Sequence, residues 1–198
     1  MNQAVKKRVW AVIDSHKDAV AEFEAEGIET IIEISESIIE CVNNGGCVYI
    51  CGNGGSAADA QHIAAEFVGR FERERKAVPA VAITTNSSII TAISNDYDYE
   101  RVFARQVEAL VKQSDILLAI STSGTSASII GAAEAALEKG ARVLAFTGRS
   151  RSRLEELADI CFCANQDSTA RSQEIHQLGY HIMAGLVEEA LIKSQKKG

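Results

Sequence analysis

The sequence has few of the features that mark secreted, membrane-bound or nucleic-acid-binding proteins. It contains one proline, Pro79, and no stretch rich in glycine, serine and proline, so nothing marks a linker between domains. Positive charge is scarce, because 20 Lys and Arg residues stand against 27 Asp and Glu residues and give a net charge of −7. An acidic chain repels a phosphate backbone, so we expect no nucleic-acid partner and local donors for any anionic ligand.

The N-terminal segment also lacks a long apolar run and a small-residue cleavage site. We therefore expect no signal peptide, no contact with a membrane and a cytoplasmic location. The cysteines are odd in number, and we expect them to be reduced thiols, several of them in buried strands. They are Cys41, Cys47, Cys51, Cys161 and Cys163. A hydrophobic fraction of 46% is enough for the core of a single domain over residues 1–198.

Hydrophobic spacing divides the chain into two regions. Residues 1–44 have helical spacing and are predicted to form an N-terminal helical extension. Beyond them, short apolar runs alternate with helical segments, which favours a parallel sheet covered on both faces. The predicted strands are residues 47–51, 80–83, 116–120, 143–146 and 160–163. This pattern predicts an α/β, doubly wound, five-stranded parallel sheet of the flavodoxin-like type, with ligands beyond the carboxyl ends of the strands.

The loop after the first strand is rich in glycine. It contains Asn53, Gly54, Gly55 and Ser56, and a helix is predicted to begin near Ser56. Glycines let a ligand approach the backbone, and the free N–H groups of the helix start point towards it. The spacing also fits a dinucleotide fingerprint, but the next strand ends at Thr84 and Thr85, where a ribose would need an acid. A nicotinamide site is therefore disfavoured.

The loop after the third strand is rich in hydroxyls. Residues 121–126 read Ser-Thr-Ser-Gly-Thr-Ser and precede a predicted helix. A helix cap needs one hydroxyl, whereas this loop offers five at a positive helix end, which suits a phosphate monoester. No Gly-Lys-Ser/Thr follows, so the loop is not a nucleotide P-loop.

Two helices carry polar stripes. His62, Glu66 and Arg70 are four residues apart and are predicted to share one face, which could bind a divalent metal or be an ordinary surface pair. Gln173, Gln177 and His181 form a similar stripe on the last helix. Asn95 and Asp96 are expected in a turn, but they could bind sugar hydroxyls if their loop met the glycine loop.

These motifs together resemble a known family. Cys-Gly-Asn-Gly-Gly-Ser at 51–56, Ser-Thr-Ser-Gly at 121–124 and Gln-Glu-Ile-His at 173–176 are similar to the sugar isomerase (SIS) domain of bacterial phosphoheptose isomerases. The resemblance implies conversion of sedoheptulose 7-phosphate to D-glycero-D-manno-heptose 7-phosphate, for lipopolysaccharide or capsule heptose. It also implies a homotetramer with sites at subunit interfaces, so that the last helix of one chain would reach the glycine loop of another.

The resemblance further implies roles for individual residues. The implied zinc ligands are His62, Glu66, Gln173 and His181, and the implied acid/base pair is Glu66 and His181. The candidate substrate-binding residues are Asn53, Gly54, Gly55, Ser56, Arg70, Asn95, Asp96 and Gln173, with Ser121, Thr122, Ser123 and Ser126 for the phosphate. The chain departs from some family members at Ala170, where those carry Asp before Arg171, so any role of that acid is absent here.

A related but different class is a non-catalytic SIS adaptor that binds the bacterial replication initiator protein. That adaptor lacks the acid and the terminal histidine, whereas Glu66 and His181 are both present here. We therefore expect an isomerase in which Glu66 moves the proton and His181 serves the sugar oxygens. This hypothesis requires the two polar stripes to converge; a separation of more than about a nanometre would exclude a shared ion.

Overall fold

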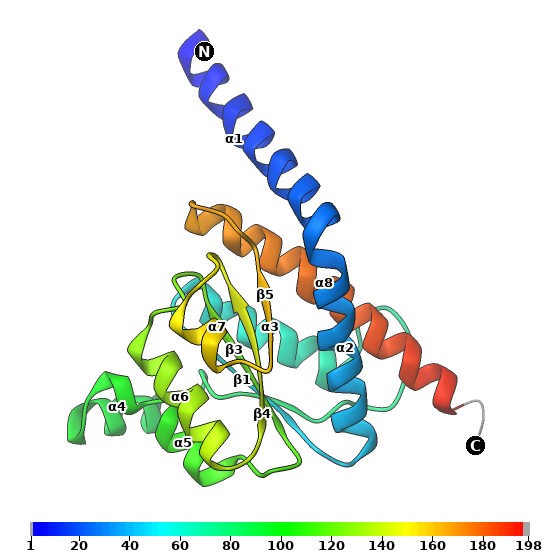
Figure 1. The fold of residues 1–198 in the computed structure, drawn as a ribbon, viewed down its shortest axis with the longest axis vertical. Helices are drawn as coiled ribbons and strands as arrows, with labels where there is room; N and C mark the ends of the chain where they lie inside the picture. Colours follow the sequence, from blue (N-terminus) through cyan, green and yellow to red (C-terminus); the bar gives the residue numbers. More distant parts are fainter. Residues whose placement is uncertain (1, 196–198) are drawn as a thin grey trace.

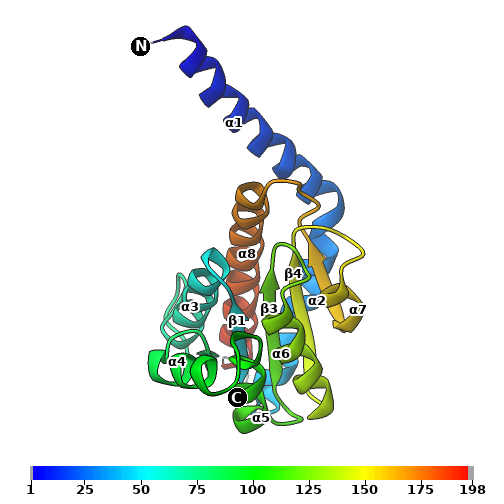
Figure 2. The same cartoon turned by 90° about the vertical axis from the view of Figure 1, so that its left-hand side faces the viewer.

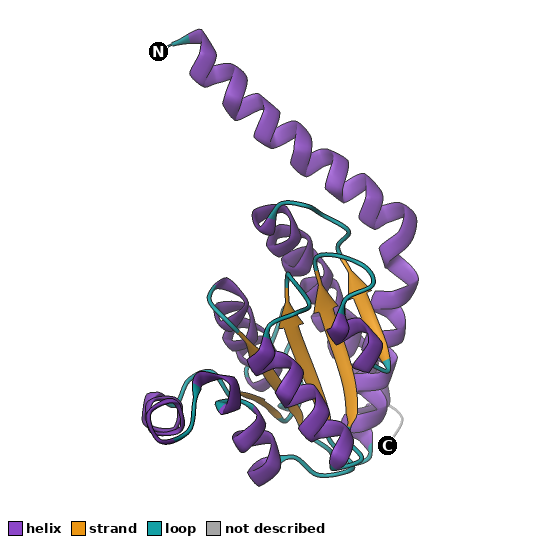
Figure 3. Ribbon diagram, turned by 60° about the vertical axis from the view of Figure 1, so that its left-hand side comes forward, coloured by secondary structure: helices purple, strands orange, loops and turns teal. Residues whose placement is uncertain are grey.

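The computed structural model describes residues 2–195, and its centre is a sheet of five strands. They are β1 (Val48–Gly52), β2 (Ala80–Ala82), β3 (Ile116–Ser121), β4 (Arg142–Thr147) and β5 (Ile160–Cys163). All neighbouring strands are parallel, and their order is β2-β1-β3-β4-β5. The prediction of a flavodoxin-like parallel sheet is confirmed, and Figure 3 shows the strands between helices.

The helices form two layers around this sheet. They are α1 (Gln3–Glu22), α2 (Ile28–Asn43), α3 (Gly55–Val68), α4 (Ser87–Asp96), α5 (Ala104–Leu110), α6 (Ala127–Glu138), α7 (Arg153–Leu157) and α8 (Thr169–Gln195). Two short turns of other geometry are η1 (Phe23–Gly27), a π-helix, and η2 (Tyr99–Arg101), a 3₁₀-helix. Helices α2, α3 and α8 cover one face, and α5, α6 and α7 cover the other.

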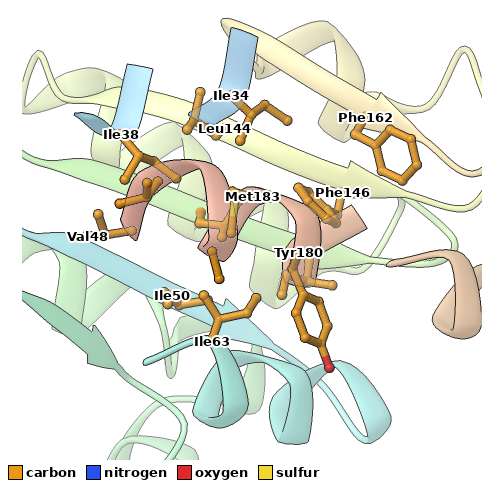
Figure 4. Packing of buried hydrophobic residues seen from close by; sticks show 14 of the residues in the cluster. Ile34, Ile38, Val48, Ile50, Ile63, Leu144, Phe146, Phe162, Tyr180 and Met183 are labelled. Carbon is orange, nitrogen blue, oxygen red and sulfur yellow. The ribbon is translucent and has the colours of Figure 1, made fainter. Parts of the chain in front are cut away.

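Each face has its own apolar core because side chains alternate along a strand. On β3, Leu118 and Ile120 pack towards α2, α3 and α8, whereas Leu117 and Ala119 pack towards α5 and α6. Figure 4 shows the first of these cores, in which Met183 of α8 lies among the strand side chains. Strands buried on both faces explain why the sequence showed continuous apolar runs rather than alternation.

The N-terminal helices differ in their surroundings. Helices α1, η1 and α2 follow one another without a break, but α1 projects away from the body (Figures 1 and 2). Helix α2 buries Ile31, Ile34 and Ile38 in the core on the α8 side. The residues predicted as an extension are thus helical, and their second half packs as part of the core. No helix within residues 2–195 is long and apolar enough to cross a membrane.

A buried ion pair fixes the segment that follows α3. The side chains of Arg75 and Glu188 are 1% and 3% exposed, and Arg75 Nε lies 3.5 Å from Glu188 Oε2. Glu188 accepts hydrogen bonds from three successive backbone N–H groups, at Phe71, Glu72 and Arg73. Burial acts to raise the pKa of Glu188, but these N–H groups and Arg75 outweigh it, so the pKa is lowered. The pair attaches the chain after α3 to α8.

Candidate active site

The two loops identified in the sequence meet at the carboxyl edge of the sheet, because β1 and β3 are neighbours. Asn53 joins them: its side-chain amide donates to Ser126 Oγ and to Ser128 Oγ, each at 2.9 Å. The Tyr99 hydroxyl donates to Asn53 Oδ1 at 2.6 Å. The predicted glycine loop and hydroxyl loop are therefore two walls of a single site.

Glycines shape the first wall. Gly54 has a φ of +57°, a conformation that side-chain-bearing residues rarely adopt. A Cβ atom at Gly55 would lie 2.1 Å from the Gln173 side-chain nitrogen, so glycine is what lets Gln173 reach the start of α3. Gln173 comes from α8, and its amide therefore lies against the loop, as the sequence analysis required.

The polar stripes of α3 and α8 converge in the same way. His62 Nε2 lies 3.0 Å from Glu66 Oε1 and 3.5 Å from His181 Nε2. These distances are far below the separation that would have excluded a shared ion. Helix α8 of the same chain reaches α3, so a second chain is not needed to bring these side chains together, and a site at a subunit interface stays a prediction.

The donor set of this cluster fits a zinc ion. Two imidazoles and a carboxylate are common zinc ligands, and bonds of roughly 2.0 Å to a tetrahedral ion separate neighbouring ligand atoms by about 3.3 Å. The observed separations of 3.0 and 3.5 Å lie on either side of that value. Within residues 2–195, however, no three His, Cys, Asp or Glu side chains are arranged as a metal centre as they stand. His62 and Glu66 form a hydrogen bond to each other.

Burial and charge also act on this cluster. Burial lowers the pKa of His181, the neighbouring His62 lowers it further, and Glu66 opposes both. Neutral imidazole nitrogens are the form that binds a metal or accepts a proton. The lowered pKa favours the neutral form of His181, whose Nε2 lies 3.5 Å from His62 Nε2.

The second wall holds the predicted phosphate residues. Ser121 Oγ accepts a hydrogen bond from Gly124 N, and Ser123 Oγ accepts one from Thr125 N, so the loop is closed by its own hydroxyls. A cavity of about 490 Å³ lies beside it. Its lining includes Thr122, Ser123, Ser172, Arg149 and Arg151. The two arginines follow β4, and sequence analysis missed them although their place after a strand was a signal.

Three predicted residues lie outside this arrangement. Helix α3 ends at Val68, so Arg70 does not share its face with His62 and Glu66; the Arg70 guanidinium is instead 3.4 Å from the Glu72 carbonyl. The helix stops there because Arg75 donates to the carbonyls of its last turn. Asn95 and Asp96 end helix α4 rather than forming a turn, and they hydrogen bond to each other.

Two further residues beside the cluster escaped the sequence analysis. Tyr180 precedes His181 on α8, and its hydroxyl lies 3.1 Å from His62 Nδ1 and 3.3 Å from Asp59 Oδ1. Burial raises the pKa of Tyr180, and Asp59 adds to that increase. Neither Tyr180 nor Asp59 belongs to the two polar stripes, whose members are four residues apart. Only the packing of α3 against α8 therefore identifies them.

The fold and this site define a SIS-domain protein. The SIS domain family matches residues 12–148, and the chain belongs to this family. Relatives named phosphoheptose isomerase include one from Roseiflexus sp. (strain RS-1), 53% identical over 163 residues, with 82% of this chain and 83% of the relative covered. One from Aliarcobacter butzleri is 42% identical over 191 residues, with 96% and 99% covered.

Solved structures agree with this assignment. A phosphoheptose isomerase from Neisseria gonorrhoeae has a TM-score of 0.89 and 39% identity, with 93% of this chain and 99% of that chain covered. One from Francisella tularensis has a TM-score of 0.91 and 34% identity, with 96% and 100% covered. The similarity thus extends along nearly the whole chain and reaches α8, which supplies His181.

Proposed function

We propose that this protein is an aldose–ketose isomerase that converts sedoheptulose 7-phosphate to D-glycero-D-manno-heptose 7-phosphate. The observation that carries the proposal is the convergence of His62, Glu66 and His181 beside the glycine loop. An adaptor that only binds another protein has no need for a carboxylate and two imidazoles in contact. The similarity to phosphoheptose isomerases over most of the chain supports the same substrate.

The reaction moves one proton between adjacent carbons. The Glu66 carboxylate takes the proton from C1 of the ketose, which gives an enediol, and returns a proton to C2, while a hydroxyl proton passes from O1 to O2. His181 serves the two oxygens, because its imidazole lies beside the same carboxylate. No oxidant or second substrate is required, since the product is an isomer of the substrate.

The two loops bind the rest of the sugar phosphate. Ser121, Thr122, Ser123 and Ser126 surround the phosphate at the start of α6, where the helix end is positive. Asn53 contacts the phosphate loop and Gln173 contacts the glycine loop, and both bind sugar hydroxyls. Neutral donors suit this chain, whose net charge of −7 would not attract an anion.

We also propose that the cluster holds one zinc ion through His62, Glu66, His181 and Gln173. Zinc would supply a Lewis acid for the carbonyl and enediol oxygens. A carboxylate bound to a metal is a weaker base, so ligand and base roles for Glu66 compete. A different divalent ion is compatible with the same N and O donors.

A homotetramer and a cytoplasmic location complete the proposal. Helix α1 supports an oligomer, because it projects from the body with Val5, Val9 and Trp10 at least half exposed. An exposed apolar stripe of this kind is typical of an interface. Lipopolysaccharide or capsule heptose is the proposed destination of the product.

A coupled assay tests the proposal. Purified protein is incubated with sedoheptulose 7-phosphate, and the aldose product is measured before and after treatment with a chelator and after zinc is added back. We expect turnover that the chelator abolishes and zinc restores. Glu66→Gln should reduce turnover at least a hundredfold, in line with loss of a general base. Absence of turnover by the zinc-loaded wild-type protein would refute the proposed function.

A further inference from the structure

Tyr99 connects a surface turn to the glycine loop. It lies in η2, the short turn between α4 and α5, where the Asp98 side chain accepts from Arg101 N and fixes the backbone of the turn. The Tyr99 side chain is 50% exposed, so its ring adds little to either core. Its hydroxyl nevertheless contacts Asn53, 46 positions earlier in the chain. This contact points to a role in the candidate active site rather than in the core.

The hydrogen-bond lengths fix the orientation of the Asn53 amide. The Tyr99 oxygen lies 2.6 Å from Asn53 Oδ1, a length typical of an O–H donor and shorter than an N–H donor usually allows. Asn53 Nδ2 lies 2.9 Å from Ser126 Oγ and from Ser128 Oγ, as expected for N–H donors. The two serines therefore use both protons of the amide nitrogen, and Oδ1 keeps one lone pair for a sugar hydroxyl.

Ser126 is held in an unusual way by this amide. It is the N-cap residue of α6, yet within residues 2–195 its side chain makes no cap hydrogen bond. A serine at an N-cap ordinarily accepts from an N–H group of the first turn. Here Ser126 Oγ accepts from Asn53 instead. The N–H groups at this positive helix end thus stay available to an anion, and Ser126 keeps its own hydroxyl proton as a further donor.

We propose that Tyr99 is a positioning residue that orients the Asn53 amide, and thereby keeps Ser126 from capping α6 and the helix start open to the substrate phosphate. The inference rests on the proposed function, since it takes the hydroxyl loop and the start of α6 as the phosphate site. Without the Tyr99 hydroxyl, the Asn53 side chain is free to rotate. Ser126 can then accept from its own helix, which leaves one N–H donor fewer for the phosphate.

Tyr99→Phe tests this directly, because it removes one oxygen and leaves the half-exposed ring in place. The probe is inorganic phosphate, whose Kd follows from the rise of Tm with phosphate concentration in the zinc-free protein at constant ionic strength. We expect phosphate binding to weaken about fivefold, as for the loss of one neutral hydrogen bond. KM for sedoheptulose 7-phosphate should rise by about the same factor, with kcat unchanged, because the groups that move the proton are untouched.

The matched control is Tyr97→Phe. Tyr97 is an exposed tyrosine two residues away, and its ring lies 5.2 Å from the Arg105 guanidinium, a contact that phenylalanine retains. This substitution should change neither the Kd for phosphate nor KM. A loss of affinity in Tyr99→Phe but not in Tyr97→Phe assigns the effect to the hydroxyl that contacts Asn53.

A double variant shows whether Tyr99 acts through Asn53. Asn53→Ala should weaken phosphate binding, and Asn53→Ala combined with Tyr99→Phe should bind phosphate as well as Asn53→Ala alone. A residue that only stabilises its own turn would instead weaken binding further in the double variant. NMR of the Asn53 side-chain amide, assigned by its loss in Asn53→Ala, gives a readout without any ligand. Its protons should exchange with water faster in Tyr99→Phe than in wild type.

The outcomes separate this inference from the proposed function. Phosphate affinity of Tyr99→Phe within twofold of wild type, or a double variant weaker than Asn53→Ala, would overturn the role of Tyr99 and leave the isomerase intact. A wild-type protein that binds no phosphate would overturn this inference together with the phosphate site. Weaker phosphate binding in Tyr99→Phe, with no turnover by the wild-type protein, would refute the isomerase but support the positioning role.

Discussion

Replacing His176 should remove much of the protein's sensitivity to mild acid. His176 lies in α8 and is fully buried; its Nε2 lies 2.9 Å from the Thr147 carbonyl at the end of β4, and its Nδ1 has no hydrogen-bond partner among residues 2–195. Burial lowers the pKa of His176 from 6.5 to about 4, and the bond to Thr147 opposes this. The folded protein therefore holds a neutral imidazole where the unfolded chain would bind a proton.

The magnitude follows from these two pKa values. A depressed folded pKa means that the unfolded state binds more protons, so the free energy of unfolding decreases as the pH falls through 6.5 and keeps decreasing until about 4. Between pH 7 and pH 5 the loss from this residue is about 2 kcal/mol. Glu188 contributes little in this window, because its pKa is lowered from an ordinary value that already lies below it.

The assay is urea unfolding of wild type and His176→Gln at pH 7 and pH 5, followed by circular dichroism at one protomer concentration. The glutamine variant should lose about 2 kcal/mol less than wild type over this change of pH. Ile175→Val is the control, because it should destabilise the same helix by about 1 kcal/mol equally at both pH values. Equal losses in wild type and His176→Gln would refute neutral burial of His176.

Three further predictions concern the ion pair, the glycine loop and α1. Glu188→Gln leaves the buried guanidinium of Arg75 unpaired and should lower the free energy of unfolding by about 3 kcal/mol or more. Exposed Glu189→Gln should leave the free energy of unfolding unchanged. Equal effects of the two substitutions would contradict a stabilising role for the Arg75–Glu188 ion pair. Gly55→Ala places a methyl group where the Gln173 amide lies and should reduce turnover at least tenfold. Gly131→Ala should not, because its methyl group would make only ordinary van der Waals contacts, at 3.6 and 3.8 Å. Emission of the single tryptophan, Trp10, should shift to shorter wavelength as the protein associates; a constant spectrum across dissociation would place α1 outside the interface.

Much of the fold could be predicted because it depends on local patterns. Short apolar runs between helical segments define buried parallel strands, and the structure has all five within one or two residues of the predicted bounds. The meeting of the glycine and hydroxyl loops follows from the strand order, since β1 and β3 are neighbours. The contact between His62 and Glu66 could likewise be predicted, because residues four apart lie on one face of a helix.

Two other predictions, both about where helices end, failed. Helical spacing continues through Arg70, but α3 ends at Val68 because Arg75 binds the carbonyls of the last turn. Asn and Asp favour turns, yet Asn95 and Asp96 belong to the last turn of α4. Domain boundaries, zinc and subunit number stay predictions.

The sequence by itself determined the sheet, the glycine-rich and hydroxyl-rich loops and the residue types available for chemistry, because each is set by neighbours along the chain. Only the tertiary structure decided that α8 packs against α3 of the same chain, which brings His181 to 3.5 Å from His62 across 119 positions. It also decided that Tyr180 joins Asp59 to His62. Contacts of this kind depend on which faces pack together, and no local periodicity encodes that choice.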